Sequence, residues 1–213
     1  MKFSRGVSFQ GFKFTGNQKN LKNQLKKILS SKNEVIKSLR KSYKDSFSKK
    51  KISNLKKYSE ISLIGMGGSS LGSRSIYSFL NEKIKKKFTF FDNLSLINNK
   101  NKIKKNKRLN IIVSKSGNTL ETITNLNIYI KKTHKNIFIT ENKDNYLISL
   151  AKKLKSEVVF HNNYIGGRFS VLSEVGMLPA ELMGLRQSKF KQFNNLVQSV
   201  CVCDWLIPPN CWH

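Results

Sequence analysis

Two clusters of glycine and hydroxyl residues directly follow short apolar runs and could hold an anionic group. The first, Gly65-Met-Gly-Gly-Ser-Ser-Leu-Gly72, follows the run Ile61–Ile64, and the second, Ser114-Lys-Ser-Gly-Asn-Thr-Leu-Glu-Thr122, follows Asn110–Val113. A strand that enters such a turn and then a helix leaves backbone N–H groups free at the helix N-terminus, where they bind phosphate together with hydroxyls. Both segments therefore predict a phosphate site.

A third segment, Ile165-Gly-Gly-Arg-Phe-Ser-Val-Leu-Ser173, adds a positive charge. Gly166 and Gly167 allow the backbone to approach a ligand closely. Arg168 stands between these glycines and Phe169, which favours a positioned guanidinium over a solvated one. A fixed arginine can stabilise an oxyanion or enediolate as it develops in a reaction.

Two nucleotide-binding motifs do not fit the first segment. A dinucleotide fingerprint would need a glycine at Ser70 and an acid about twenty residues further on, whereas Asp92 comes later. A Walker-type loop would need Gly-Lys-Ser/Thr, which the first segment lacks. Its glycines could also serve only tight packing of a helix on a strand. Glu121, in the first turn of a predicted helix, is expected to cap that helix before any catalytic role.

Alternating strand and helix patterns must position these segments. Continuous apolar runs that alternate with amphipathic stretches indicate a parallel sheet covered by helices on both faces. We therefore predict an α/β fold, a three-layer αβα sandwich with a mostly parallel five-stranded sheet. Ligands bind outside the carboxyl ends of such strands. The predicted strands are 61–64, 88–91, 109–113, 137–140 and 158–160; the predicted helices are 70–80, 120–130, 147–154 and 173–185.

The two ends of the chain differ from its middle. Residues 1–17 predict an extended arm, and helical spacing follows from Asn20 to Tyr43 with a break near 30–33. Residues 201–213 hold every cysteine and both tryptophans, which suggests a non-native tail, with ordinary C-terminal variation as the alternative. The spacing of these cysteines and His213 matches no common zinc module, so no metal is expected. We predict an N-terminal arm and helices over 1–54, a phosphate-binding domain over 55–190 and an incomplete or non-native tail over 191–213.

Composition limits the partners. The formal net charge is +28, but the lysines accompany asparagine, isoleucine and serine throughout the chain, which indicates a codon bias. No specific nucleic-acid partner is expected, although non-specific polyanion binding at low salt is. No apolar run reaches membrane-spanning length and the first residues lack the apolar part of a signal peptide, so a soluble, cytoplasmic protein without a membrane partner is expected.

Together the three segments resemble the phosphoglucose isomerase family, within the wider sugar-isomerase (SIS) fold. The family patterns Gly-Ile-Gly-Gly-Ser-x-Leu-Gly, Ser-Lys-Thr/Ser-x-x-Thr-x-Glu-Thr and Gly-Gly-Arg-Phe-Ser-Val-x-Ser correspond to 65–72, 114–122 and 166–173. Order and spacing agree, and the last pattern separates this family from other SIS proteins. The departures are Met66 for isoleucine, Ser70 for the common aspartate, and Gly117 and Asn118 where many members have Phe and Thr.

The resemblance implies a SIS domain of flavodoxin-like topology, a homodimer and no cofactor. It also implies the isomerisation of glucose 6-phosphate to fructose 6-phosphate through a cis-enediol, a step of glycolysis and gluconeogenesis, with Arg168 stabilising the enediolate. The implied phosphate contacts are Ser69, Ser70, Ser114, Lys115, Ser116 and Thr119, supported by the backbone of Gly67, Gly68, Gly117, Gly166 and Gly167.

Length is the largest departure from the family. Its members have two SIS domains and take the general base glutamate, the ring-opening histidine and a late lysine from the second half. No corresponding pattern follows Leu185, and His134 and His161 precede the arginine segment and do not match. We therefore expect an N-terminal fragment with little or no isomerase activity. The alternatives are a non-catalytic phosphosugar-binding module and, less favoured, a polyanion-binding protein.

Overall fold

A parallel five-stranded sheet forms the centre of the protein. The structure is a computed structural model that describes residues 23–24, 27–28, 30–94, 108–131 and 133–191. The strands lie in the order β2-β1-β3-β4-β5, which is the flavodoxin-like order. Their bounds are β1 (Glu60–Gly65), β2 (Lys87–Phe91), β3 (Leu109–Val113), β4 (Lys135–Glu141) and β5 (Glu157–His161). The α/β sandwich predicted from the sequence is confirmed.

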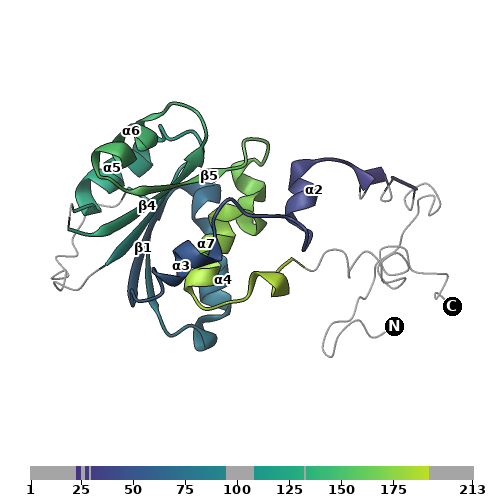
Figure 1. Ribbon diagram of the computed structural model, residues 1–213, viewed down its shortest axis with the longest axis horizontal. Helices are drawn as coiled ribbons and strands as arrows, with labels where there is room; N and C mark the ends of the chain where they lie inside the picture. The colour runs from purple at the N-terminus through teal and green to yellow at the C-terminus, as the bar shows by residue number, and fades with distance from the viewer. Residues whose placement is uncertain (1–22, 25–26, 29, 95–107, 132, 192–213) are drawn as a thin grey trace.

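Helices cover both faces of the sheet (Figure 1). Those on one face are α3 (Lys49–Ser53), α4 (Leu71–Phe79) and α7 (Glu174–Leu182); those on the other are α5 (Leu120–Tyr129) and α6 (Tyr146–Lys153). Successive strand residues point to opposite faces, so Leu63 packs toward α4 and α7 while Ile64 packs toward α5 and α6. Both side chains are fully buried, which explains why the strands read as continuous apolar runs.

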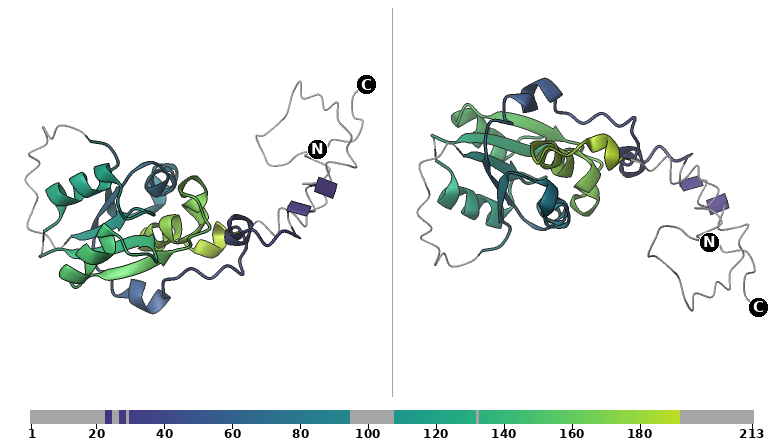
Figure 2. Two further views of the ribbon diagram at one scale, coloured as in Figure 1. Left: turned by 90° about the horizontal axis from the view of Figure 1, so that it is seen from above. Right: turned by 90° about the horizontal axis from the view of Figure 1, so that it is seen from below.

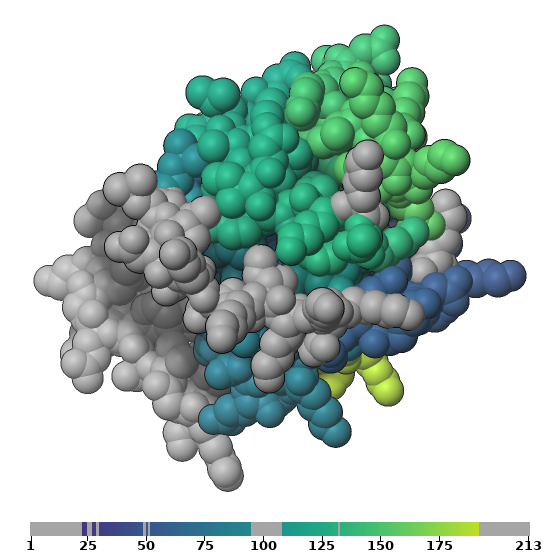
Figure 3. Space-filling view, turned by 90° about the vertical axis from the view of Figure 1, so that its left-hand side faces the viewer, coloured from purple at the N-terminus to yellow at the C-terminus, as the bar shows by residue number. Residues whose placement is uncertain are grey.

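The parallel arrangement places the ends of β1 and β3 next to each other. Gly65 pairs in register with Val113, and a Cβ at Gly65 would lie 2.9 Å from the Val113 carbonyl oxygen. Each strand then turns into a helix, β1 into α4 and β3 into α5. The first two predicted segments therefore leave the same edge of the sheet. In the space-filling view of Figure 3, α5 (teal) and α6 (green) form one continuous surface.

The N-terminal helical region differs from its prediction. Helix α2 covers only Glu34–Ser38, begins at the side-chain cap of Asn33 and does not reach Tyr43. The connector from α2 to α3 instead passes alongside β5 and α7 (Figure 2). At the other end, a short 3-10 turn covers Gln187–Lys189. The predicted arm over 1–17 and the cysteine-bearing tail lie outside the described residues.

Two further results concern the described ranges alone. None of their helices has the length and apolar character needed to cross a membrane. In that part of the chain, no group of three or more histidine, cysteine, aspartate or glutamate side chains is placed to hold a metal ion.

Candidate functional site

The turn after β1 offers one free hydroxyl. A 3-10 turn (η1) spans Gly67–Ser69, and Gly67 takes the left-handed φ of 55° that favours glycine. Ser70 is fully buried, and its Oγ donates to the carbonyl of Gly67 at 3.2 Å. The hydroxyl of Ser69 makes no hydrogen bond to any described residue. Of the two serines predicted here, Ser69 is therefore the one available to a ligand.

In the turn after β3, the two predicted serines differ in exposure. Ser114 is buried, lies 2.9 Å from Thr119 through the two hydroxyl oxygens, and accepts from the backbone N–H of Gly117 at 3.2 Å. Ser116 is exposed and its Oγ accepts from the N–H of Asn118 at 3.3 Å, so its O–H remains free to donate. Ser114 thus shapes the turn, while Ser116 faces outward.

Asn145, a residue that the sequence interpretation did not single out, holds this turn from behind. A Cβ at Gly117, whose φ is 68°, would lie 2.1 Å from Asn145 Oδ1. Asn145 caps α6 by accepting from the N–H of Ile148 at 3.0 Å and donates to Thr140 Oγ1 at 3.1 Å. The signal for it was an asparagine directly before an amphipathic stretch, a common N-cap.

The third predicted segment packs directly on the first. It forms a 3-10 turn (η3) over Gly167–Leu172. A Cβ at Gly68 would lie 2.4 Å from the carbonyl carbon and oxygen of Gly167. Ser170 Oγ donates to the carbonyl of Gly167 at 2.6 Å and lies 3.3 Å from the carbonyl of Gly68. Next to this contact, Ser73 Oγ on α4 donates to the carbonyl of Val175 on α7 at 3.2 Å. Two segments about one hundred residues apart therefore share one backbone interface.

Lys115 connects the second segment to the third. Its ammonium donates to the carbonyl oxygen of Asn163 at 2.6 Å, just before the Gly-Gly-Arg sequence. Arg168 itself is exposed, and its guanidinium lies 6.0 Å from the centre of the Phe169 ring. No described residue accepts a hydrogen bond from it. The structure fixes the backbone of Arg168 and leaves its charged group open to a ligand.

Two helix N-termini complete the arrangement. The caps of α4 and α5 are Ser70 and Thr119, and neither makes a side-chain capping hydrogen bond. Their first-turn N–H groups are therefore available, and the helix dipoles favour an anion there. With the nearby Lys115 and Arg168, this edge of the sheet can bind a phosphate and stabilise a second negative charge on the same ligand.

A buried pair on the other side of the third segment was also missed. His161 ends β5 and Glu174 begins α7, and both are 2% exposed. They border an open pocket of about 670 Å³ that also contacts Tyr43 and Phe160. None of the predicted phosphate contacts lines this pocket. The one sequence feature that pointed to this pair is an acid, Glu174, at the first position of a helix that follows a glycine-rich turn.

Two curated relatives, each more than 30% identical to this chain, have the same name. The chain is 36% identical over 149 residues to "Glucose-6-phosphate isomerase" of Borreliella afzelii (strain PKo), an alignment that covers 60% of this chain and 27% of that relative. It is 32% identical over 166 residues to the protein of the same name from Methanocaldococcus jannaschii, covering 71% and 39%. The chain thus spans between about a quarter and two fifths of the length of these relatives.

Solved structures share the fold. Hypothetical protein TT0462 from Thermus thermophilus aligns with a TM-score of 0.67 at 20% identity, covering 89% of this chain and 51% of that one. Tagatose-6-phosphate ketose/aldose isomerase from Escherichia coli aligns with a TM-score of 0.53 at 16% identity, covering 73% and 47%. A sequence model of the family described as phosphoglucose isomerase matches residues 13–205. With the three segments gathered at one edge of a parallel sheet, this match places the chain in the phosphoglucose isomerase family.

Proposed function

We propose that this chain supplies the phosphate-binding and enediolate-stabilising part of a glucose-6-phosphate isomerase. The observation that carries the proposal is the contact between Gly68 and Gly167, which brings the turn before the open N-terminus of α4 against the backbone that bears Arg168. The names of the curated relatives support the substrate. We propose residues 55–190 as the sugar-phosphate unit, in a cytoplasmic enzyme that acts as a homodimer.

The proposed contacts divide into three roles. Ser69, Ser116 and Thr119 present hydroxyls to the phosphate, with Lys115 adding charge. Ser70 and Ser114 act from within, by shaping the turns that aim the backbone N–H groups. Arg168 faces the sugar and stabilises the negative charge that develops on the enediolate oxygens as a proton moves between C1 and C2.

We assign no general base to this chain. Proton transfer between carbon atoms requires a positioned base whose pKa suits the working pH. Glu174 and His161 are paired with each other and buried. Glu121 lies in the first turn of α5, where a carboxylate is favoured by the dipole. The chain alone is therefore expected to bind a sugar phosphate and to turn it over slowly or not at all.

The test measures binding and turnover on the same preparation. Calorimetry with glucose 6-phosphate at near-physiological salt should show one site, whereas glucose should not bind. Ser69→Ala should weaken binding about tenfold. The control is Ser149→Ala, at an exposed serine on α6, which should leave binding unchanged. Equal loss in both variants, or equal binding of any polyanion, would remove the sugar-phosphate assignment. Full isomerase turnover would contradict the missing base, and binding without turnover in a longer family member would favour a phosphosugar-binding module.

A further inference from the structure

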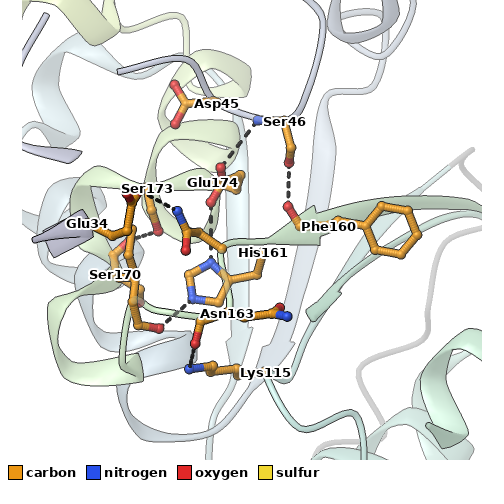
Figure 4. A network of polar contacts seen from close by, with 12 residues as sticks. Glu34, Asp45, Ser46, Lys115, Phe160, His161, Asn163, Ser170, Ser173 and Glu174 are labelled. Carbon is orange, nitrogen blue, oxygen red and sulfur yellow. Dashed lines mark hydrogen bonds and ion pairs between the residues drawn. The ribbon is translucent and has the colours of Figure 1, made fainter. Parts of the chain in front are cut away.

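A buried polar network lies beside the Gly166–Ser173 segment, and Figure 4 shows it together with the contact between Lys115 and Asn163. Its centre is the pair His161 and Glu174, whose side chains are 1% and 3% exposed. His161 Nδ1 lies 3.3 Å from Glu174 Oε2, and His161 Nε2 lies 3.0 Å from the carbonyl oxygen of Ile165. The two residues therefore bracket the segment that carries Arg168.

The partners of His161 determine where its protons sit. The carbonyl oxygen of Ile165 can only accept, so Nε2 must carry a hydrogen. Nδ1 faces a carboxylate oxygen, which accepts when Glu174 is ionised. A neutral imidazole has one N–H and cannot serve both acceptors. Either the ring carries two protons, or Glu174 carries one.

The surroundings of Glu174 favour the ionised carboxylate. Its second oxygen, Oε1, accepts from the hydroxyl of Tyr43 at 3.1 Å and from the backbone N–H of Ser46 at 3.3 Å. Burial raises the pKa of Glu174, but the hydrogen bond and charge of His161, a backbone hydrogen bond and the Tyr43 hydroxyl outweigh it, so the net pKa is lowered. Other charged groups nearby pair among themselves, Asp45 with Lys191 at 2.8 Å and Glu34 with Lys37 at 2.6 Å, and Arg40 and Lys44 line the same pocket.

This network holds both ends of the arginine segment. At its start, His161 holds the carbonyl of Ile165, Lys115 holds that of Asn163, and Asn162 Nδ2 donates to Glu34 at 2.9 Å. At its end, Glu174 is tied to β5 through His161 and to the α2–α3 connector through Tyr43. Between them lie two glycines, which by themselves constrain the backbone little.

We propose that His161 and Glu174 form a buried imidazolium–carboxylate pair that positions the backbone of Arg168 toward its ligand. Both are positioning residues, since both side chains are buried and bonded to each other. The effect on Arg168 rests on the function proposed above, whereas the ion pair itself does not. The pair would act on recognition of the enediolate charge and leave recognition of the phosphate group largely unchanged.

The ion pair is tested by nitrogen-15 NMR on the full chain. The chain has three histidines, and His161 is assigned by the signal that disappears in His161→Gln. Two ring N–H groups at neutral pH are the expected result. In Glu174→Gln the ring should keep only the Nε2 proton. A neutral His161 ring in the unaltered protein would overturn the ion pair.

The positioning role is tested with two phosphate ligands of different charge. Arabinonate 5-phosphate carries a carboxylate that imitates the enediolate, and sorbitol 6-phosphate has the phosphate without it. The unaltered chain should prefer the first. Glu174→Gln and His161→Gln should reduce that preference about tenfold and change the sorbitol 6-phosphate Kd less than twofold. The control is His134→Gln, the same change at a histidine near the opposite ends of the strands. It should leave both the preference and the sorbitol 6-phosphate Kd unchanged.

The outcomes separate the two proposals. A preference that is unchanged in Glu174→Gln would overturn the positioning role. Equal weakening of both ligands, with a lower melting temperature, would mean that the pair serves stability alone. If His161→Gln fails to fold, Tyr43→Phe removes one donor to Glu174 and should lower the preference two- to threefold. If the unaltered chain binds neither ligand, the proposed function and the positioning role fail together, and the NMR result still decides the ion pair.

Discussion

The ammonium of Lys115 lies 2.6 Å from the carbonyl oxygen of Asn163, across 48 positions of sequence. The contact joins the turn after β3 to the loop that precedes Gly166. Since Lys115 is only partly exposed, this is a charge-assisted hydrogen bond at the edge of the site. One side chain thus couples the proposed phosphate turn to the arginine segment.

Replacing Lys115 with glutamine should weaken sugar-phosphate binding more than it lowers stability. The change removes both the tie to Asn163 and a positive charge near the phosphate. We expect at least a tenfold higher Kd for glucose 6-phosphate by calorimetry, and a loss of about 1 kcal/mol in unfolding free energy. Lys143→Gln, at an exposed lysine of the β4–α6 loop, is the control. Equal effects of the two changes on binding would show that net charge alone matters.

Gly68 and Gly167 should respond differently to alanine. A Cβ at Gly68 would lie 2.4 Å from backbone atoms of Gly167, whereas a Cβ at Gly167 has nothing within 4 Å. Gly68→Ala should therefore lower the unfolding free energy by about 2 kcal/mol through overpacking, and Gly167→Ala should change it by about 0.5 kcal/mol or less. Urea unfolding measures both. Similar losses would contradict the close contact between the two turns.

The two serines after β3 should separate structure from ligand contact. Ser114 is buried and bonded to Thr119 and Gly117. Its replacement by alanine should lower the unfolding free energy by about 1 to 2 kcal/mol. Ser116→Ala should leave stability unchanged and raise the Kd for glucose 6-phosphate several-fold, because its exposed O–H is free to donate. If Ser114→Ala alone weakened binding, the phosphate would not reach the outer hydroxyls.

Local sequence patterns predicted the strands because the three central strands, β1, β3 and β4, are buried on both faces and therefore form continuous apolar runs. The strand predicted over 109–113 has the same bounds in the structure, and the one predicted over 61–64 gains a residue at each end. The two phosphate segments and the arginine segment could be predicted from their residue types and their order along the chain. Their meeting at one edge follows from the parallel topology.

What could not be predicted depends on contacts between distant residues. Tyr43 continues the helical spacing of residues 35–39, yet it lies outside α2, and its hydroxyl donates to Glu174, 131 positions away. The inward hydroxyl of Ser70 depends on the local turn that η1 makes. His161 matches no catalytic position of the family, and its burial beside Glu174 is visible only once β5 and α7 are packed.

The stabilising effect of Glu174 should depend on acidity in a defined direction. Its folded-state pKa is lowered below the usual 4.5, so its contribution is present above that value and is lost as the pH falls through the folded pKa. Between pH 5 and 3 free histidines stay charged. In that range the stability gap between the unaltered protein and Glu174→Gln, about 3 kcal/mol at pH 7, should shrink. Urea unfolding at several pH values measures it, and a gap that widened with acid would contradict the ionised carboxylate.

Ser62 gives a prediction of the opposite sign, in which the loss of a hydroxyl stabilises the protein. Ser62 lies on β1, is 1% exposed, and within the described residues its Oγ has no hydrogen-bond partner. A buried hydroxyl without a partner costs about 1 to 3 kcal/mol, so Ser62→Ala should raise the unfolding free energy by about 1 kcal/mol.

The matched control is Ser73→Ala, at an equally buried serine whose Oγ donates to the carbonyl of Val175 at 3.2 Å. It should lower the unfolding free energy by about 1 kcal/mol. Asn110, which pairs in register with Ser62, also has a buried side-chain oxygen without a partner among the described residues. If urea unfolding showed that both serine variants lose stability, Ser62 would be donating to Asn110 Oδ1 in solution. A gain for Ser62→Ala alone would establish that β1 carries an unpaired hydroxyl beneath the site.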